Sequence, residues 1–292
     1  MLLQQAANGL MLGASYALIA IGYTLVFGVL KLVHLAHGEV FMVGAFIGLQ
    51  VVLWTGAGMA TALVAALVAT AVLGIVIERV AVRPIRTRGG HLLAPMISTI
   101  GVGIVLQEVA TRLFGAEQVG FPARMDAITW HIGSLTVTSI QVAILATSLL
   151  LMAVLHVFVT RTRLGMAMRA TAESLVVARL LGIRTDHIIA LTFAIASGLG
   201  GAAGVLVGLS FNAISPFMGI DMGVKGLAIM LLGGLGNIYG AMVGGIILGV
   251  VEVMSVAYLA SSYRDAFAFL IMIAVLLFRP QGLFGSEETM QG

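Results

Sequence analysis

The chain has no cysteine and very few charged residues. The missing cysteine excludes disulfides and thiolate metal sites. Only 9% of the 292 residues are charged, whereas a soluble domain has about 25%. Because 60% of the residues are hydrophobic, a water-soluble surface cannot be built from this composition. We therefore expect the chain to lie in a lipid bilayer.

Several kinds of functional site are also missing. Lys31 follows Leu30 and Lys225 follows Val224, so no Gly-Lys-Ser/Thr phosphate-binding loop is present. The six histidines form neither an HExxH pair nor a cluster with ligand spacing. No basic stripe with interleaved aromatic residues points to nucleic acid. We expect no metal, no cofactor and no ATP hydrolysis in this chain itself.

Long apolar runs dominate the sequence. A helix needs about 20 apolar residues to cross a core roughly 30 Å thick. The runs and their breaks predict about eight transmembrane segments in one all-α, polytopic bundle covering residues 1–292. The runs are Asn8–Leu30, Val40–Ile77 (divided near Gly56), Leu92–Phe114, Thr138–Val159, Ile188–Leu209, Gly223–Leu259 (divided at Gly233–Asn237) and Ala266–Phe278.

One predicted segment, Gly223–Leu235, is short and broken by glycine. Its 13 residues span only about 20 Å as a helix. Short, glycine-interrupted segments of polytopic proteins often lie at the transport path. A tight helical hairpin buried in the bundle explains the pattern equally well, so both interpretations stay open.

The distribution of Lys and Arg predicts the orientation. If residues 160–187 are cytoplasmic, alternating spans place eleven basic residues inside and four outside. No basic residue precedes Lys31, so the N-terminus is predicted to start the first span rather than a cleaved signal peptide. The N-terminus is then outside and the C-terminus cytoplasmic. The four outer residues are Arg112, Arg124, Lys225 and Arg264.

Glycines recur every four residues in several spans. Small residues at this spacing allow helix backbones to pack closely in lipid. This pattern predicts a tight bundle without choosing a function. The sets are Gly9/Gly13, Gly44/Gly48, Gly200/Gly204/Gly208 and Gly236/Gly240/Gly244. Between the spans, residues 115–137 form a sizeable outer loop whose alternating apolar residues favour a short hairpin or an interfacial segment, and residues 210–222 form a second.

The segment Thr160–His187 carries five arginines between two apolar spans. Residues 165–182 lack proline and favour a helix, which Gly182 can end, while Thr185 and Asp186 can cap the next span. The alternative is a solvated linker with arginines that follow the positive-inside rule. Helix connections usually have two to eight residues, however, so the 28 residues here favour a docking element for another protein.

Three acidic positions lie within or next to spans. Glu39 stands at the predicted cytoplasmic start of the second span, where it would face the positive end of the helix dipole. Glu108 and Arg112 are four apart and can pair. Glu252 lies well inside its span, so it is either part of a functional site or hydrogen-bonded to a neighbouring helix or subunit.

The motifs together resemble a known family. The matching pieces, in order, are Asn8-Gly9-Leu10 with Gly13 and Tyr16-Ala17-Leu18; Leu35-Ala36-His37-Gly38-Glu39; Arg169-Ala170 with residues 178–183; Gly233-Gly234-Leu235-Gly236-Asn237; and residues 278–285. Over its whole length the chain resembles the branched-chain amino acid ABC transporter permeases of the LivH type. His34 and Leu35 depart from that family, which usually has Asn and Phe there.

The resemblance implies a membrane subunit of a binding-protein-dependent importer in the bacterial inner membrane. It implies as partners a second, homologous permease, two ATP-binding cassette subunits that bind ATP and Mg²⁺, and an extracytoplasmic solute-binding protein. The substrate would be a branched-chain or other amino acid, with urea, amides and small aromatic acids as alternatives. We predict that the ATPase docks on Arg169, Ala170, Glu173, Ala178, Arg179, Leu181 and Gly182. Candidate residues of the translocation path are Asn8, Ser15, Tyr16, Glu39, Asn237 and Glu252.

Two other functions compete with this one. An ion-coupled secondary transporter would use Glu252 and work without ATP. An intramembrane serine protease would use Ser15, which lies in a Gly-x-Ser element, but it would need a histidine base at the same depth. His156 and His187 are predicted near the cytoplasmic ends of their helices, which speaks against the protease.

Overall fold

The computed structural model describes residues 2–56, 58–89, 93–121, 128–132, 135–259 and 264–285. Arg124, one of the four predicted outer basic residues, lies outside these ranges. The elements are α1 (Leu2–Leu30), α2 (His37–Thr55), α3 (Met59–Ile77), the π-helical turn η1 (Glu78–Val82), α4 (Arg83–Thr87), α5 (Leu93–Phe114), β1 (Thr129–Ile132), β2 (Leu135–Thr138), α6 (Ser139–Arg161), α7 (Arg163–Glu173), α8 (Leu175–Leu180), α9 (Thr185–Phe211), α10 (Met218–Gly233), α11 (Ile238–Tyr258) and α12 (Arg264–Phe278).

The chain is a polytopic helical membrane protein, as predicted. Within the described ranges, seven helices are long and apolar enough to cross a membrane. They are α1, α2, α3 with its continuation through η1 and α4, α5, α6, α9 and α11. The 16 residues of α10 and the 15 of α12 complete the bundle. The count of about eight crossings and the orientation of the termini stay predictions.

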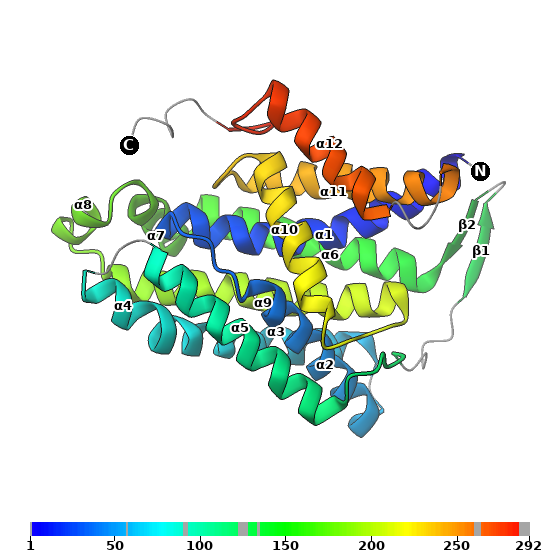
Figure 1. Cartoon of the computed structure of the whole chain (residues 1–292), viewed down its shortest axis with the longest axis horizontal. Coiled ribbons are helices and arrows are strands. Elements are labelled where there is room, and N and C mark those ends of the chain that lie inside the picture. The colour runs from blue at the N-terminus through cyan, green and yellow to red at the C-terminus, as the bar shows by residue number, and fades with distance from the viewer. Residues whose placement is uncertain are drawn as a thin grey trace.

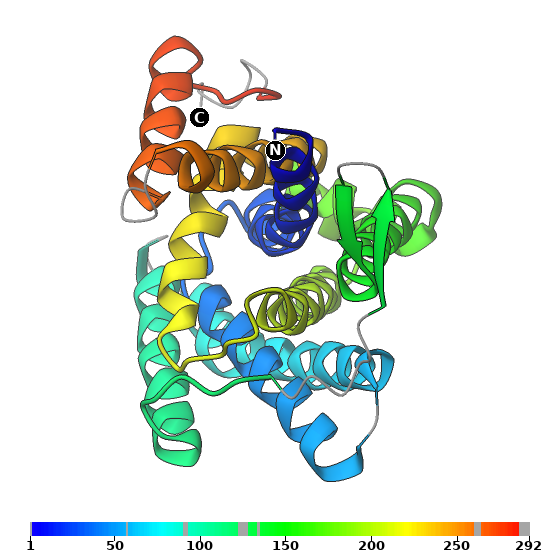
Figure 2. The same ribbon diagram turned by 90° about the vertical axis from the view of Figure 1, so that its right-hand side faces the viewer.

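The bundle has two distinct ends (Figure 1). The arginine-rich end carries α4, α7 and α8, and the hairpin end carries the N-terminus and the β1–β2 hairpin. The hairpin pairs Thr129 with Thr138 and Ile132 with Leu135, which confirms that the outer loop contains one. A view onto the hairpin end places α1 and α9 in the middle of the bundle (Figure 2). Both are buried along most of their length, while α3, α5 and α6 are more exposed.

The glycines hold the central helices together at the predicted spacing. A methyl group on Gly13 of α1 would lie 2.7 Å from the Cα of Ile246 in α11, and one on Gly9 would lie 2.6 Å from the Cα of Val250. In the same way Gly44 of α2 meets the backbone of Gly201 in α9. Since close backbone contact replaces the weak hydrophobic drive between helices in lipid, these glycines confirm the tight packing.

The start of α2 lies deep in the bundle. The ring of His37 occupies the space where a side chain on Gly22 would lie, and Gly22 is eight residues before the end of α1. That separation corresponds to about 12 Å of helix. Residues 31–36 therefore turn back into the bundle, beginning with Lys31 in the left-handed conformation (φ 55°). Glu39 lies in the first turn of α2, as predicted, but this turn lies within the bundle rather than at its end.

The connection from α9 to α11 also differs from the prediction. The loop predicted over residues 210–222 is shorter, because α9 continues to Phe211 and α10 begins at Met218. Helix α10 ends at Gly233, and Gly234 and Gly236 adopt positive φ angles in the turn before α11. Glycine is needed there because other residues rarely adopt that conformation. The C-terminal segment pairs with this turn, since Leu283 N–H donates to Leu232 O at 2.8 Å.

Candidate functional site

The segment between α6 and α9 folds into two short helices rather than the single one predicted over residues 165–182. The break falls at Ser174, whose extended backbone ends α7 and whose hydroxyl caps α8 by accepting from Val177 N–H at 3.3 Å. A serine at this position competes with helix continuation, because its side chain satisfies the first amides of the next helix. Gly182, in the left-handed conformation (φ 81°), ends the element as expected.

An apolar surface is exposed on this element. Leu180 is 82% exposed and Leu181 73%, and both lie at the tip of the arginine-rich end. We call this surface the leucine patch; its residues are Leu164, Met166, Val176, Val177, Leu180 and Leu181. Exposed apolar patches rimmed by polar residues mark interaction sites. Four arginines of the same segment, namely Arg161, Arg163, Arg169 and Arg179, are exposed as well.

The predicted docking residues divide into an exposed and a buried group. Arg169, Glu173, Leu181 and Gly182 are exposed and Ala170 is partly buried. Ala178 is buried, in a helix that packs against α7 and α9, so it does not offer a contact surface. Val176, Val177 and Leu180 are exposed as well but were not among the predicted docking residues.

A charge network fixes α8 to the bundle. Arg179 Nε donates to Thr185 Oγ1 at 2.9 Å, and Arg86 binds Asp186 Oδ1 at 2.7 Å. Thr185 and Asp186 therefore hold arginines, and the prediction that they cap α9 is wrong. Arg86 also lies 3.7 Å from Glu78, a fully buried carboxylate of η1 that Arg83 binds at 2.8 Å. A movement of α8 would thus reach α9 and the end of α3.

A second polar cluster surrounds Glu252 near the hairpin end of α11. Glu252 is fully buried, and its Oε1 accepts from Tyr16 Oη at 3.0 Å and from Lys225 Nζ at 3.1 Å. Arg264 forms an ion pair with the same oxygen, and Asp265 binds Lys225 at 2.8 Å. The cluster joins α1, α10, α11 and α12. Of the alternatives left open for Glu252, the bonds to neighbouring helices are present.

Lys225 is not a surface residue, contrary to the prediction from alternating spans. It is 5% exposed and faces Glu252 from α10. The positive-inside rule counts charges in loops, whereas this lysine lies inside a helix and is neutralised there. The rule that ionisable groups within the membrane pair with one another could have found it.

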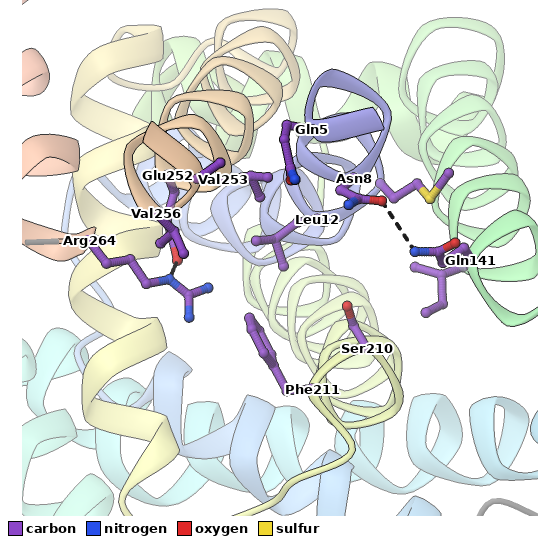
Figure 3. Close-up of a pocket in the computed structure, with 13 residues that line it drawn as sticks. Gln5, Asn8, Leu12, Gln141, Ser210, Phe211, Glu252, Val253, Val256 and Arg264 are labelled. Atoms are coloured by element: carbon purple, nitrogen blue, oxygen red, sulfur yellow. Dashed lines mark hydrogen bonds and ion pairs between the residues drawn. The ribbon is translucent and has the colours of Figure 1, made fainter. Parts of the chain in front are cut away.

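A cavity of about 320 Å³ lies beside this cluster (Figure 3). Glu252 and Arg264 face the cavity from one side. Asn8 and Gln141 face it from the other side, and Gln141 Nε2 donates a hydrogen bond to Asn8 Oδ1 at 3.3 Å. Ser210 and Phe211 of α9 form its floor in this view. Asn8, Glu252 and Arg264 therefore line one cavity. The negative charge of Glu252 is neutralised by Lys225 and Arg264.

The other predicted path residues lie apart from this cavity. Ser15 is buried, and its hydroxyl bonds to Met11 O of its own helix at 3.5 Å rather than to a histidine. Asn237 caps α11 by accepting from Gly240 N–H and donates to Phe284 O at 2.9 Å. The Gly233–Asn237 motif therefore has a structural role, because Asn237 anchors the C-terminal segment.

Glu39 lies in a third region, at the deep start of α2. Tyr23 packs edge-on against the ring of His37 at 4.7 Å, and His34 contacts His37 and Phe193. The ring nitrogens of both histidines and Oε2 of Glu39 have no hydrogen-bond partner among the described residues. Among all the residues that the structure describes, no group of three or more His, Asp or Glu side chains could hold a metal ion.

Comparisons with known proteins agree on one family. The family model described as "Branched-chain amino acid transport system / permease component" matches residues 5–276. LivH of Escherichia coli K12, a high-affinity branched-chain amino acid transport system permease protein, is 40% identical over 98% of this chain and 96% of its own length. BraD of Pseudomonas aeruginosa, which carries the same description, is also 40% identical, over 98% and 97%. A probable LivH of Methanocaldococcus jannaschii is 28% identical over 92% and 88%. No solved structure gives a significant match.

Proposed function

The chain belongs to the family of permease components of branched-chain amino acid transport systems, and from this premise we propose that it is the membrane subunit of an ATP-driven importer. Its substrate is a branched-chain or related amino acid, delivered by an extracytoplasmic binding protein at the hairpin end. A second permease completes the membrane part. ATP is hydrolysed by two separate ATPase subunits, and the arginine-rich end faces the cytoplasm of a bacterial inner membrane.

The leucine patch carries this proposal. Six large apolar residues are exposed on an element that also carries exposed arginines, and contact with a partner protein would bury them. Interface cores are apolar and their rims polar, so the apolar residues suit the centre of such a contact and the arginines its edge. We assign the patch to the ATPase subunit, with Arg169 and Glu173 at the edge of the contact.

The contacts of α7 and α8 provide a route by which a movement of the ATPase subunits would reach the central helices. α7 packs against α1, α6 and α9, while Arg179 and Arg86 tie α8 to the start of α9. When ATP binding draws the two ATPase subunits together, the element moves with them. Because α1 and α9 are the central helices, this movement changes access to the translocation path from one end to the other.

The ion-coupled carrier receives less support. A carrier of that kind needs a carboxylate that takes up and releases a cation. Glu252 is already bound by Lys225 and Arg264 from neighbouring helices. The pairing favours a role in holding the helices together.

Substitution of the leucine patch tests the proposal. Leu180→Glu and Leu181→Glu place a charge in the centre of the contact, and we expect both to abolish co-purification of the ATPase and leucine uptake by reconstituted vesicles. Leu180→Met keeps the apolar contact, so we expect it to retain both ATPase co-purification and leucine uptake. Ile128→Glu places the same charge on an exposed residue of the opposite, hairpin end and is the control for ATPase co-purification, which it should leave unchanged. Normal ATP-dependent uptake by Leu180→Glu would refute the docking assignment.

A further inference from the structure

Glu39 is a buried carboxylate without a counter-charge. Three carboxylates are buried in the described ranges, namely Glu39, Glu78 and Glu252. Glu78 is paired with Arg83 and Arg86, and Glu252 with Lys225 and Arg264. Glu39 is 6% exposed, and the described residues offer it no ion pair. An unpaired carboxylate at this depth is costly, and such groups mark functional positions in membrane proteins.

A pocket of about 240 Å³ opens onto Glu39. It lies over the start of α2, which packs against both α5 and α10; these two helices lie on the near face of the bundle in Figure 1. Gly103, Gly219 and Gly223 line it, and a methyl group on Gly219 would collide with the Glu39 carboxylate. The glycines therefore give the pocket its space beside the charge.

The lining has the chemistry of an aliphatic amino acid site. Glu39 supplies a carboxylate for an ammonium group, and its Oε2 has no partner among the described residues. The starts of α2 and α10 meet at Glu39, and their dipoles favour the negative charge of this carboxylate. Gln107 offers an amide for the carboxylate of the ligand. Apart from Tyr23, the remaining wall is branched and apolar: Leu35, Ile100, Ile104, Ile220, Val224 and Leu227.

We infer that this pocket holds the transported amino acid during its passage, with the ammonium group on Glu39 and the branched side chain against α5 and α10. The inference rests on the proposed function, because it assigns the substrate of that importer to a place in the permease. The pocket is preferred to the cavity of Figure 3, where two cations already neutralise Glu252. A zwitterion gains an ion pair at Glu39 without breaking one.

Photolabelling tests the assignment directly. The complete transporter, purified without its binding protein, is illuminated with a diazirine analogue of leucine, and the labelled peptides are identified by mass spectrometry. We expect labels on α5 and α10 around Ile104 and Val224. Leucinol, which keeps the ammonium group, competes with the label, and 4-methylpentanoate, which lacks it, does not.

Matched variants identify the contact. Glu39→Gln keeps the shape and removes the charge, so labelling and leucine uptake fall at least tenfold. Glu108→Gln makes the same change on α5, where Glu108 is exposed and paired with Arg112, and leaves both unchanged. Should Glu39→Gln fail to assemble, Ile104→Trp decides: it fills the pocket from an exposed position and retains Glu39.

The outcomes separate the two proposals. Absence of ATP-driven uptake by the unaltered transporter would overturn the proposed function itself. Uptake by that transporter together with labels confined to the cavity of Figure 3, or with full labelling of Glu39→Gln, would overturn only the assignment of the pocket. Normal uptake by Ile104→Trp would do the same.

Discussion

Replacing Glu252 and Lys225 one at a time and together measures how the membrane charges stabilise the bundle. Glu252→Gln leaves the buried Lys225 with one carboxylate partner, that of Asp265. It also removes the Glu252 ion pair of Arg264. Removing one partner of a buried ion pair costs about 3–5 kcal/mol. Lys225→Met also removes the contact with Asp265, but that side chain is 60% exposed and can be hydrated. The substitution is milder because Glu252 keeps Arg264 and Tyr16, and it loses about 1.5–3 kcal/mol for the charged hydrogen bond to Glu252.

The double variant distinguishes a true interaction from general disruption. With Lys225 already replaced by methionine, Glu252→Gln no longer strands a buried lysine, so its added cost shrinks. We expect the double variant to be less destabilised than the sum of the singles by about 1–3 kcal/mol. The free energy of unfolding is measured by SDS titration in mixed micelles, followed by far-ultraviolet circular dichroism.

The exposed pair Glu108–Arg112 provides the control, since Glu108→Gln should cost less than about 1 kcal/mol. Additivity of Glu252→Gln and Lys225→Met within about 0.5 kcal/mol would refute the interaction between the two side chains. Arg264 would then be the remaining cation on Glu252 in the comparison of the two pockets.

Three further changes probe the packing. Gly13→Val pushes α1 from α11, where a methyl group would already lie 2.7 Å from Ile246, and we expect loss of the folded protein in size-exclusion chromatography, whereas Gly101→Ala, with open space around it, has no such effect. Asn237→Ala removes a helix cap and the bond to Phe284, costing about 1–2 kcal/mol in the same SDS titration. Arg86→Gln releases Asp186, so α8 should become more sensitive to limited proteolysis while the midpoint of global unfolding moves little.

The sequence predicted the features that depend on local pattern. Apolar runs gave the helices, and glycines four apart gave the contacts of α1 with α11. Gly182 was recognised as a terminator because a left-handed residue after a helix is usually glycine. These signals are contained in a few neighbouring residues, so no knowledge of the tertiary arrangement was needed.

The features that were missed depend on contacts between distant segments. Residues 31–36 resemble an ordinary connection, and only the space at Gly22 and Gly200 allows His37 to lie within the bundle. Lys225 meets Glu252 from another helix, and no periodicity links the two positions. The exposed apolar residues of α8 were not predicted, because Ser174 breaks a helix that composition alone would continue.

The deep start of α2 has a consequence for the order in which the protein is made. Backbone that is not helical at this depth is tolerated only when other protein segments surround it. For residues 31–36, that cover includes Thr99 of α5, whose hydroxyl accepts from Leu35 N–H at 3.1 Å, and Phe193 of α9, which packs on His34. Both emerge from the ribosome well after α2. We therefore expect residues 31–36 to reach their final position only after α9 has been synthesised.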